Sequence, residues 1–427
     1  MSDPAPATLC DVTVIGGGLA GKAASLHFAR AGLKVVCIEP RQPVRPALGE
    51  SLDWSAPALL DVLGLPSDKL VGSRIATWKR HVTLKLRDGC DAHYVPTPWL
   101  GGPPFHINLT TLHVERTQLD DEILKMVLDE GITFVRDRVV DVETVGRKIC
   151  SVQTETGARF SSPWFIDASG IGGSVVARKF NLPSLQYGPT KVATLYMDPM
   201  PTEYLEWIWE IPVSPDTVSV GYVAPGSAVK AMRDHGGSVD DIFRQQLAKF
   251  PRFEPLLQQG SLSAVNATSF RCRVYLESAG PNWLTAGEAA SLVDPMTSNG
   301  VTAALRHAAE AAALILKFRK RGELPLRARK AYSSRILQTA KFFNEGIETI
   351  LYEPLVRNRI GLSRAGTVYT SPAWSMNVVY ARLGPTGLLS TFCLGAMLGF
   401  FRVSASILRW YCGLVKASVA KQECGLS

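Results

Sequence analysis

The sequence lacks several features that mark common classes of protein. Its eight cysteines are scattered, and no close pair has the spacing of metal ligands, which argues against structural zinc and for a reduced, cytoplasmic protein. Residues 1–8 contain no basic region followed by an apolar core, so we expect no secretory signal peptide. No nucleic-acid-binding module accompanies the net charge of +8, so we expect no nucleic acid partner. What remains is a globular protein without a metal site, and its 427 residues, 46% of them hydrophobic, suffice for two or three lobes.

The chain also lacks a charge-free run long enough to make a clear membrane span. Residues 383–401 carry no charge over 19 residues, but they include glycines and a proline. A spanning helix needs about 20 mostly apolar residues, so the run predicts a buried or interfacial helical region, with an exposed docking face as the functional option; membrane contact is not favoured. Basic residues cluster between Lys317 and Arg335, which suits an acidic partner or membrane surface as well as a solvated helix end.

A dinucleotide-binding pattern stands near the N-terminus. A buried strand is expected at residues 11–15 and a helix at 19–31, with a Gly-x-Gly-x-x-Gly turn between them. A second strand, 34–38, ends at Glu39, which lies 23 residues after the first glycine. In such a unit the pyrophosphate lies at the helix N-terminus and the carboxylate binds the ribose hydroxyls. The glycines are Gly16, Gly18 and Gly21.

A second motif lies at residues 207–212, which read Trp-Ile-Trp-Glu-Ile-Pro. Trp207 and Trp209 are two positions apart and would lie on the same face of a strand, which is also how a sheet buries aromatic bulk. Together with the glycine turn, the motif resembles the flavin-dependent halogenases and the aromatic monooxygenases related to them. The resemblance implies FAD as cofactor, and it makes both indoles the wall of a path between flavin and substrate.

Two more segments carry the same resemblance. Gly49-Glu50-Ser51 would lie beside the flavin, although a loop with an ordinary helix N-cap at Asp53 or Ser55 explains it equally well. Residues 164–170 form an apolar strand that ends in Asp-Ala-Ser-Gly. This strand resembles the stretch that closes the dinucleotide domain near FAD, where small residues let the backbone approach the cofactor.

Residues 283–301 resemble a segment of the same family that contains Gly-Asp-Ala-Ala. In the family, this segment is followed by a helix whose N-terminus lies beside the isoalloxazine ring of the flavin. Glu288 replaces the usual aspartate, which keeps the carboxylate and adds a methylene. Arg116 resembles a flavin-proximal arginine, and it could equally pair with Asp120. The residues expected to hold the cofactor are Gly16, Gly18, Gly21, Glu39, Glu50, Arg116, Glu288, Pro295, Ser298, Asn299, Gly300 and Val301.

Lys79 is the residue on which the reaction class depends. It lies where halogenases carry the lysine that handles hypohalous acid, and an exposed strand lysine is the plain alternative. An ammonium can polarise hypohalous acid, whereas desolvation lowers a lysine pKa and favours a haloamine. Thr297 stands where tryptophan halogenases carry a catalytic glutamate. Phenol- and pyrrole-type halogenases also lack that glutamate, so its absence excludes one subgroup.

The activity that the resemblance favours is FAD-dependent hydroxylation of an aromatic substrate, namely indole or tryptophan, through a flavin C4a-hydroperoxide formed with O2. The pattern most resembles the monooxygenases that oxidise a tryptophan of a partner polypeptide during tryptophylquinone biogenesis. Catalytic roles are expected for Lys79, Trp207 and Trp209. Candidate acid/base groups are His81, His93, His106 and His113.

Several alternatives stay open. The first is a flavin-dependent halogenase that uses Lys79, and the second is a membrane-associated prenyl-type flavin reductase. The third is a non-catalytic assembly flavoprotein. No second glycine-rich unit is present for a nicotinamide, which fits reduction by NAD(P)H directly or by a separate flavin reductase.

The expected fold is α/β. A glutathione-reductase-like (Rossmann-type) FAD domain carries an inserted mixed β-sheet substrate lobe and a C-terminal helical region that could dock a partner or a membrane. The expected boundaries are 8–75, 111–180 and 276–320 for the FAD domain, 76–110 and 181–275 for the substrate lobe, and 321–427 for the helical region.

Overall fold

The structure is a computed structural model, and a five-stranded parallel sheet with strand order β17-β12-β2-β3-β8 forms the core of one of its two lobes. The described residues are 8–40, 48–85, 91–94, 100–103, 106, 110–193, 207–259, 265–348, 352–353, 392, 395–396, 399, 403, 406–407 and 410–418. The strands of this sheet are β17 (Trp283–Thr285), β12 (Trp164–Asp167), β2 (Val12–Ile15), β3 (Val35–Glu39) and β8 (Thr133–Arg136). Its strands come from widely separated parts of the chain, which is the discontinuous Rossmann-type arrangement expected.

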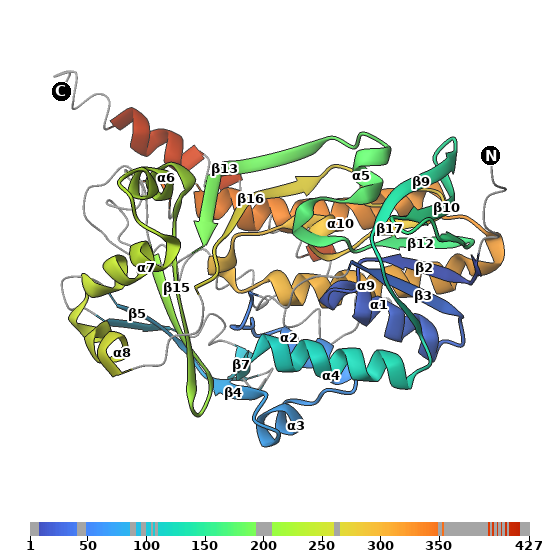
Figure 1. Ribbon diagram of the computed structural model, residues 1–427. Coiled ribbons are helices and arrows are strands. Elements are labelled where there is room, and N and C mark those ends of the chain that lie inside the picture. The colour runs from blue at the N-terminus through green and yellow to red at the C-terminus, as the bar shows by residue number, and fades with distance from the viewer. Residues whose placement is uncertain are drawn as a thin grey trace.

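Both faces of the parallel sheet are covered, as its apolar strands require. The helices α1 (Leu19–Arg30) and α4 (Arg116–Asp129) lie on one face (Figure 1). Val12 and Val14 point into this helical core, together with residues of α9 (Gly300–Phe318). Ile15 points to the opposite face and packs against a four-stranded sheet. The strands of that sheet are β1 (Thr8–Leu9), β11 (Arg159–Ser161), β10 (Lys148–Thr154) and β9 (Val139–Val145).

A second five-stranded sheet forms the other lobe, with order β14-β15-β13-β16-β18. Its strands are β14 (Trp207–Ser214), β15 (Thr217–Pro225), β13 (Ser184–Ala193), β16 (Thr268–Tyr275) and β18 (Ser291–Leu292). All of its described pairings are antiparallel, where we expected a mixed sheet. The helices α6 (Gly226–Asp234), α7 (Val239–Ala248) and α8 (Glu254–Gln259) and the turn η3 (Pro251–Phe253) lie at its outer side (Figure 1).

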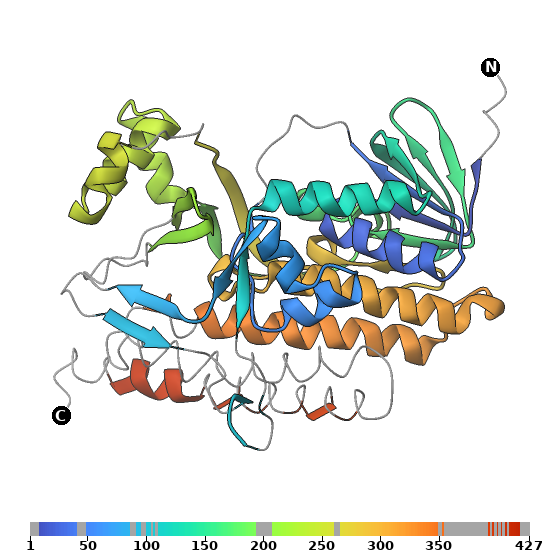
Figure 2. The same ribbon diagram turned by 90° about the horizontal axis from the view of Figure 1, so that it is seen from below.

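Two long helices run beside each other under both lobes (Figure 2). They are α9 (Gly300–Phe318) and α10 (Leu326–Gly346), joined through η6 (Arg319–Arg321). Because α9 begins just after β18, its N-terminus lies at the junction of the two lobes. The remaining elements are α2 (Ala56–Val62), α3 (Ser67–Gly72), β4 (Ala76–Lys79), β5 (Val82–Lys85), β6 (Asp91–Tyr94), β7 (Thr111–Val114), η2 (Gly170–Gly172), α5 (Val175–Lys179), η4 (Gly287–Ala289) and η5 (Pro295–Thr297).

The C-terminal region is described in part. Within residues 392–418 every described position has helical backbone. The expectation of burial is wrong for Phe392, which is 73% exposed, and the interfacial alternative stays open. Among the residues that the structure describes, no helix is long and apolar enough to cross a bilayer. Most of the apolar run 383–401 lies outside the described residues.

Candidate active site

The glycine turn after β2 has the shape of a nucleotide cradle. Gly16 has a φ of +96°, and a Cβ there would lie 2.3 Å from the carbonyl oxygen of Ala168. Gly18 is the N-cap of α1 and is exposed, and a Cβ there would meet no atom within 4 Å. Glu39, at the end of β3, accepts a hydrogen bond from the backbone N–H of Gly17. The backbone is therefore tight where the turn packs and open where a phosphate would approach.

A buried arginine and a carboxyl lie close to this cradle. Arg116, at the start of α4, donates to the carbonyl of Leu48 and pairs with Asp120 at 3.2 Å, so the expected salt bridge exists. Gly49 has a φ of +104°, which favours glycine, and a Cβ there would lie 2.7 Å from a guanidinium nitrogen of Arg116. Burial raises the pKa of Glu288, while Arg116 acts in the opposite direction. The fold thus brings Arg116 within electrostatic range of Glu288.

The segment between β18 and α9 presents open backbone and one free acceptor. Ser298 adopts the left-handed conformation with φ 54°, and α9 begins at Gly300, where a Cβ would meet no atom within 4 Å. The amide nitrogen of Asn299 donates to Asp53 at 2.6 Å. The buried Oδ1 of Asn299 has no hydrogen-bond partner. Buried polar atoms are normally satisfied, so this acceptor and the open helix N-terminus fit a bound cofactor.

Lys79 is buried at the end of β4, so the exposed-lysine alternative is wrong. Its side chain is 2% exposed, and Nζ donates to Ser51 Oγ at 2.8 Å and to the carbonyl of Leu52 at 2.9 Å. The ring centroid of Trp54 lies 4.6 Å from Nζ. Burial lowers the pKa of Lys79 to about 7, although the charge of Asp53 opposes the shift. The amine can therefore gain or lose a proton near neutral pH.

Of the candidate histidines, His113 is the one beside Lys79. It lies on β7, where it forms a bridge with Ser51, and its Nδ1 is buried without a hydrogen-bond partner. Burial and then the charge of Lys79 lower its pKa to about 3, so the imidazole is neutral. His81 and His106 are exposed, and the side chain of His93 lies outside the described residues.

The two indoles of the tryptophan motif lie on the same face of β14. Trp209 packs against Gly221 of β15, where a Cβ would lie 2.6 Å from the ring. Its indole N–H donates to Ser219 Oγ at 2.9 Å, and Ser219 donates to Glu50 Oε1 at 2.8 Å. Glu50 is bonded along the backbone to Ser51, which accepts a hydrogen bond from Lys79, so the tryptophan motif and the lysine are held by adjacent residues of one segment. Glu50, expected at the cofactor, thus also fixes Trp209.

A groove of about 370 Å³ lies away from this site. It is lined by Glu210, Val218 and Val220, together with residues of η3 and α8. Because side chains alternate along a strand, these positions face away from Trp209 and Ser219. We therefore assign the chemistry to the Trp209 face and not to the groove.

Several residues of the site were missed by reasoning from sequence. Asp53 was considered only as an N-cap, and its side chain does accept from the N–H of Ser55, but it also holds Asn299. Ser219 is separated from Glu50 by 169 residues, and no local pattern indicates that pairing. The indole N–H of Trp207 donates to the hydroxyl of Tyr352 at 2.9 Å. Tyr352 lies in a segment that matched no motif.

Two family models together match residues 11–345 of the chain. The model of the FAD-dependent oxidoreductases matches residues 11–179, and that of the tryptophan halogenases matches residues 106–345. The flavin-dependent halogenase armH5 of Armillaria mellea is 27% identical over 71% of this chain and 64% of its own length. The menaquinone reductase of Mycolicibacterium smegmatis is 30% identical over 69% of this chain and 73% of its own length. The flavin-dependent brominase Bmp2 has a similar fold, with a TM-score of 0.66 at 21% identity over 92% of this chain and all of that one.

The chain thus spans slightly less than two thirds of the length of armH5. Bmp2, at its low identity, supports the fold alone. The expected halogenase and monooxygenase superfamily and the α/β fold are both confirmed. Among these relatives, nothing supports the resemblance to tryptophylquinone biogenesis, and the halogenase alternative is better supported than the hydroxylase that we favoured.

Proposed function

Because this chain belongs to the tryptophan halogenase family, we propose that it is a flavin-dependent halogenase that transfers a halogen to an electron-rich aromatic ring. The observation that carries the proposal is Lys79. It is fully enclosed, bonded to Ser51 and the Leu52 carbonyl, and linked through Glu50 and Ser219 to Trp209. A hydroxylase transfers oxygen from the cofactor directly to a positioned substrate, so it does not need an ammonium to activate a diffusing oxidant.

FAD fits the open glycine turn, the carboxylate of Glu39 and the free acceptor of Asn299. We assign its binding to the residues predicted from the sequence, namely Gly16, Gly18, Gly21, Glu39, Glu50, Arg116, Glu288, Pro295, Ser298, Asn299, Gly300 and Val301. When bound and reduced, FAD supplies the chemistry by which O2 oxidises a halide to hypohalous acid. NAD(P)H or a separate flavin reductase provides the electrons.

Lys79 acts on the hypohalous acid. Its ammonium donates a hydrogen bond to the oxygen, which makes the halogen more electrophilic. The ring carbon then bonds to the halogen while the oxygen–halogen bond breaks, and the departing hydroxide combines with the ring proton as water. Trp207 and Trp209 separate the cofactor from the substrate. Thr297 places no carboxylate beside the ring, which favours phenols and pyrroles, since halogenases of these types also lack that glutamate.

Reduction of a prenylated quinone is a second candidate. It is favoured by the 30% identity to a menaquinone reductase and by the exposed apolar residues of the C-terminal region. Such a reaction needs neither halide nor O2. A product two mass units heavier than the supplied menaquinone, formed without bromide and without air, would favour this candidate over halogenation.

The test is product analysis with matched lysine and arginine variants. FAD-loaded protein receives a flavin reductase, NADH, O2 and bromide with phenol, pyrrole, indole and tryptophan substrates, and products are read by their bromine isotope doublet. Lys79→Ala should lower bromination about a hundredfold or more, the usual contribution of a positioned acid or base. Arg80→Ala, which alters the exposed neighbouring residue, should have little effect. Products that gain oxygen and no bromine would instead establish the hydroxylase.

A further inference from the structure

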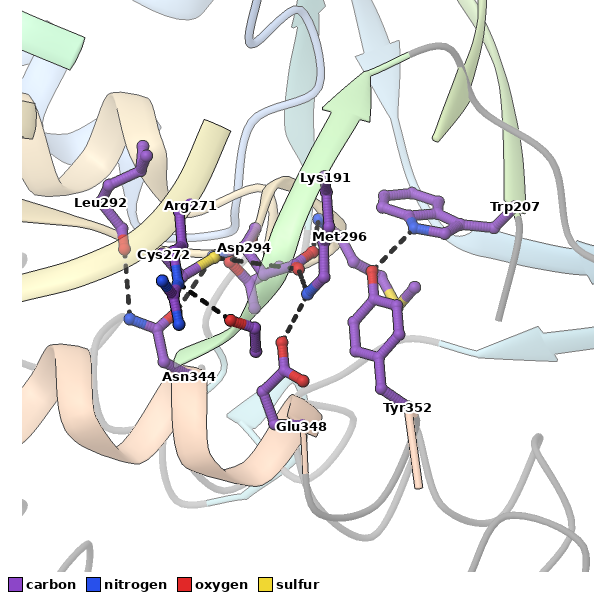
Figure 3. A network of polar contacts seen from close by, with 12 residues as sticks. Lys191, Trp207, Arg271, Cys272, Leu292, Asp294, Met296, Asn344, Glu348 and Tyr352 are labelled. Carbon is purple, nitrogen blue, oxygen red and sulfur yellow. Dashed lines mark hydrogen bonds and ion pairs between the residues drawn. The ribbon is translucent and has the colours of Figure 1, made fainter. Parts of the chain in front are cut away.

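A buried charge cluster lies beside the tryptophan motif, and the proposed reaction does not use it (Figure 3). Lys191 of β13 is 2% exposed, and its Nζ lies 3.0 Å from Asp294 Oδ2 and 2.5 Å from Glu348 Oε1. Glu348 follows α10, and Asp294 follows β18. Three segments that are distant in sequence therefore meet at one ammonium group.

The backbone of β13 is shaped to receive Glu348. The register with β16 shifts between Tyr187 and Lys191, which is a bulge. Within it, Gly188 has a φ of +59°, and a Cβ there would lie 2.2 Å from Glu348 Oε1. The side chain of Arg271 donates to the carbonyl of Gly188 at 3.0 Å and supports the bulge. A built pocket for one carboxylate is the result.

The cluster keeps Lys191 charged. Burial alone would lower its pKa, but Asp294 and Glu348 raise it above its usual value. The second oxygen of Asp294 accepts the N–H of Met296 at 3.0 Å, so that carboxylate is fixed from two sides. Burial raises the pKa of Glu348, with Lys191 opposing. A buried ammonium held in this way gives a fixed point of positive charge.

Tyr352 lies between this charge and the tryptophan motif. Its ring centroid is 3.7 Å from Lys191 Nζ, within the range of a cation–π contact. Its hydroxyl oxygen accepts the indole N–H of Trp207 at 2.9 Å. Trp207 is buried, and its N–H would otherwise be an unsatisfied donor. The orientation of Trp207 is thus set from the far side by a residue that follows α10.

We propose that Tyr352 is a positioning residue for Trp207, held in place by the Lys191–Glu348 ion pair, and that it keeps the indole wall closed during halogen transfer. Only the second part of this proposal, that the indole wall stays closed during halogen transfer, rests on the proposed function. Loosening Trp207 would let hypohalous acid escape before it meets the substrate. Tyr352 therefore controls how much oxidant is converted into halogenated product.

Tyr352→Phe is the direct test, because it keeps the ring on Lys191 and removes the oxygen that Trp207 needs. Protein labelled with 5-fluorotryptophan gives a ¹⁹F resonance for Trp207, assigned by its loss in Trp207→Phe. We expect this resonance to move in Tyr352→Phe and to stay in Tyr332→Phe. Tyr332→Phe is a matched control, because it removes the buried hydrogen bond from the Tyr332 hydroxyl to the carbonyl of Thr285, which does not involve Trp207.

The second readout is the ratio of free hypobromous acid, trapped by a dimedone reagent, to brominated product. We expect Tyr352→Phe to raise it about fivefold, the factor that corresponds to one ordinary hydrogen bond. Glu348→Gln keeps the shape that fits Gly188 and removes the charge, so it should move the same Trp207 resonance. Unchanged resonances in both variants would overturn the proposal. The ¹⁹F measurement needs no turnover, so a failure of halogenation itself would leave this result interpretable.

Discussion

At the scale of single residues, the proposed role of Lys79 depends on its protonation state. The amine has a pKa of about 7, below the ordinary lysine value of 10.5, because burial disfavours the charge. Nζ donates to two fixed oxygens, of Ser51 and Leu52, and an ammonium has a third proton left for a ligand. This geometry favours hydrogen bonding to hypohalous acid by the charged form over attack by the neutral amine.

We therefore expect the bromination rate constant to fall as pH rises through about 7, since the ammonium is lost over that range. Lys79→Arg, whose guanidinium does not deprotonate in proteins, should have a lower rate that stays flat across the same pH range. The measurement is the single-turnover bromination rate of the natural protein and of Lys79→Arg between pH 5.5 and 9, a range that brackets the pKa of Lys79. A rate that rises through pH 7 in the natural protein would instead identify the neutral amine and a nitrogen–halogen bond as the reactive form.

At the scale of elements, two glycines at opposite ends of α1 distinguish backbone strain from a steric collision. Gly16 and Gly32 both have positive φ, +96° and +79°. A side chain at either position costs backbone strain on the order of 1–3 kcal/mol. A Cβ at Gly16 would also collide with the backbone of Ala168, whereas one at Gly32 would meet nothing within 4 Å.

Gly16→Ala should therefore lose FAD and destabilise the fold by more than Gly32→Ala does. The collision partner is backbone, so the whole turn must shift away from the nucleotide. FAD retained after gel filtration and the midpoint of thermal unfolding measure the two effects. If Gly16→Ala retained FAD as fully as Gly32→Ala, the turn would not be the pyrophosphate site.

The elements that could be predicted from the sequence are those encoded locally. The strand, glycine turn, helix and Glu39 follow one another within 39 − 12 + 1 = 28 residues, and the structure has them as β2, α1 and β3. Lys79 could be placed by resemblance, but its burial could not, because it depends on Ser51 and Leu52 of another segment. Tyr352 and Trp207 are 145 residues apart. Contacts at such separations leave no periodic signal, which is why Tyr352 was not predicted.

At the scale of the whole molecule, the C-terminal region presents apolar side chains outward. Val403, Ile407, Trp410 and Leu414 recur at the spacing of one helix face, and their exposed fractions are 60%, 57%, 66% and 49%. The opposite face of the helical residues 410–418 points inward, with Cys412 and Val415 buried, and Lys416 pairs with Glu353 at 2.6 Å. An exposed apolar row of this kind suits the surface of a bilayer, and the excess of basic residues in the chain suits anionic lipid.

We expect the purified protein to float with phosphatidylglycerol vesicles in a density gradient and to float less with phosphatidylcholine. The double variant Ile407→Glu and Trp410→Glu should abolish flotation, because it places two carboxylates in the apolar row. Val145→Glu is the matched control, since Val145 is 74% exposed on β9 and should not contribute. Equal flotation of all three proteins, or none by the natural protein, would rule out this lipid surface and leave the row for a protein partner. If the protein brominates as proposed, bromination by the double variant should be unchanged in solution, because Ile407 and Trp410 lie outside the proposed halogenation site.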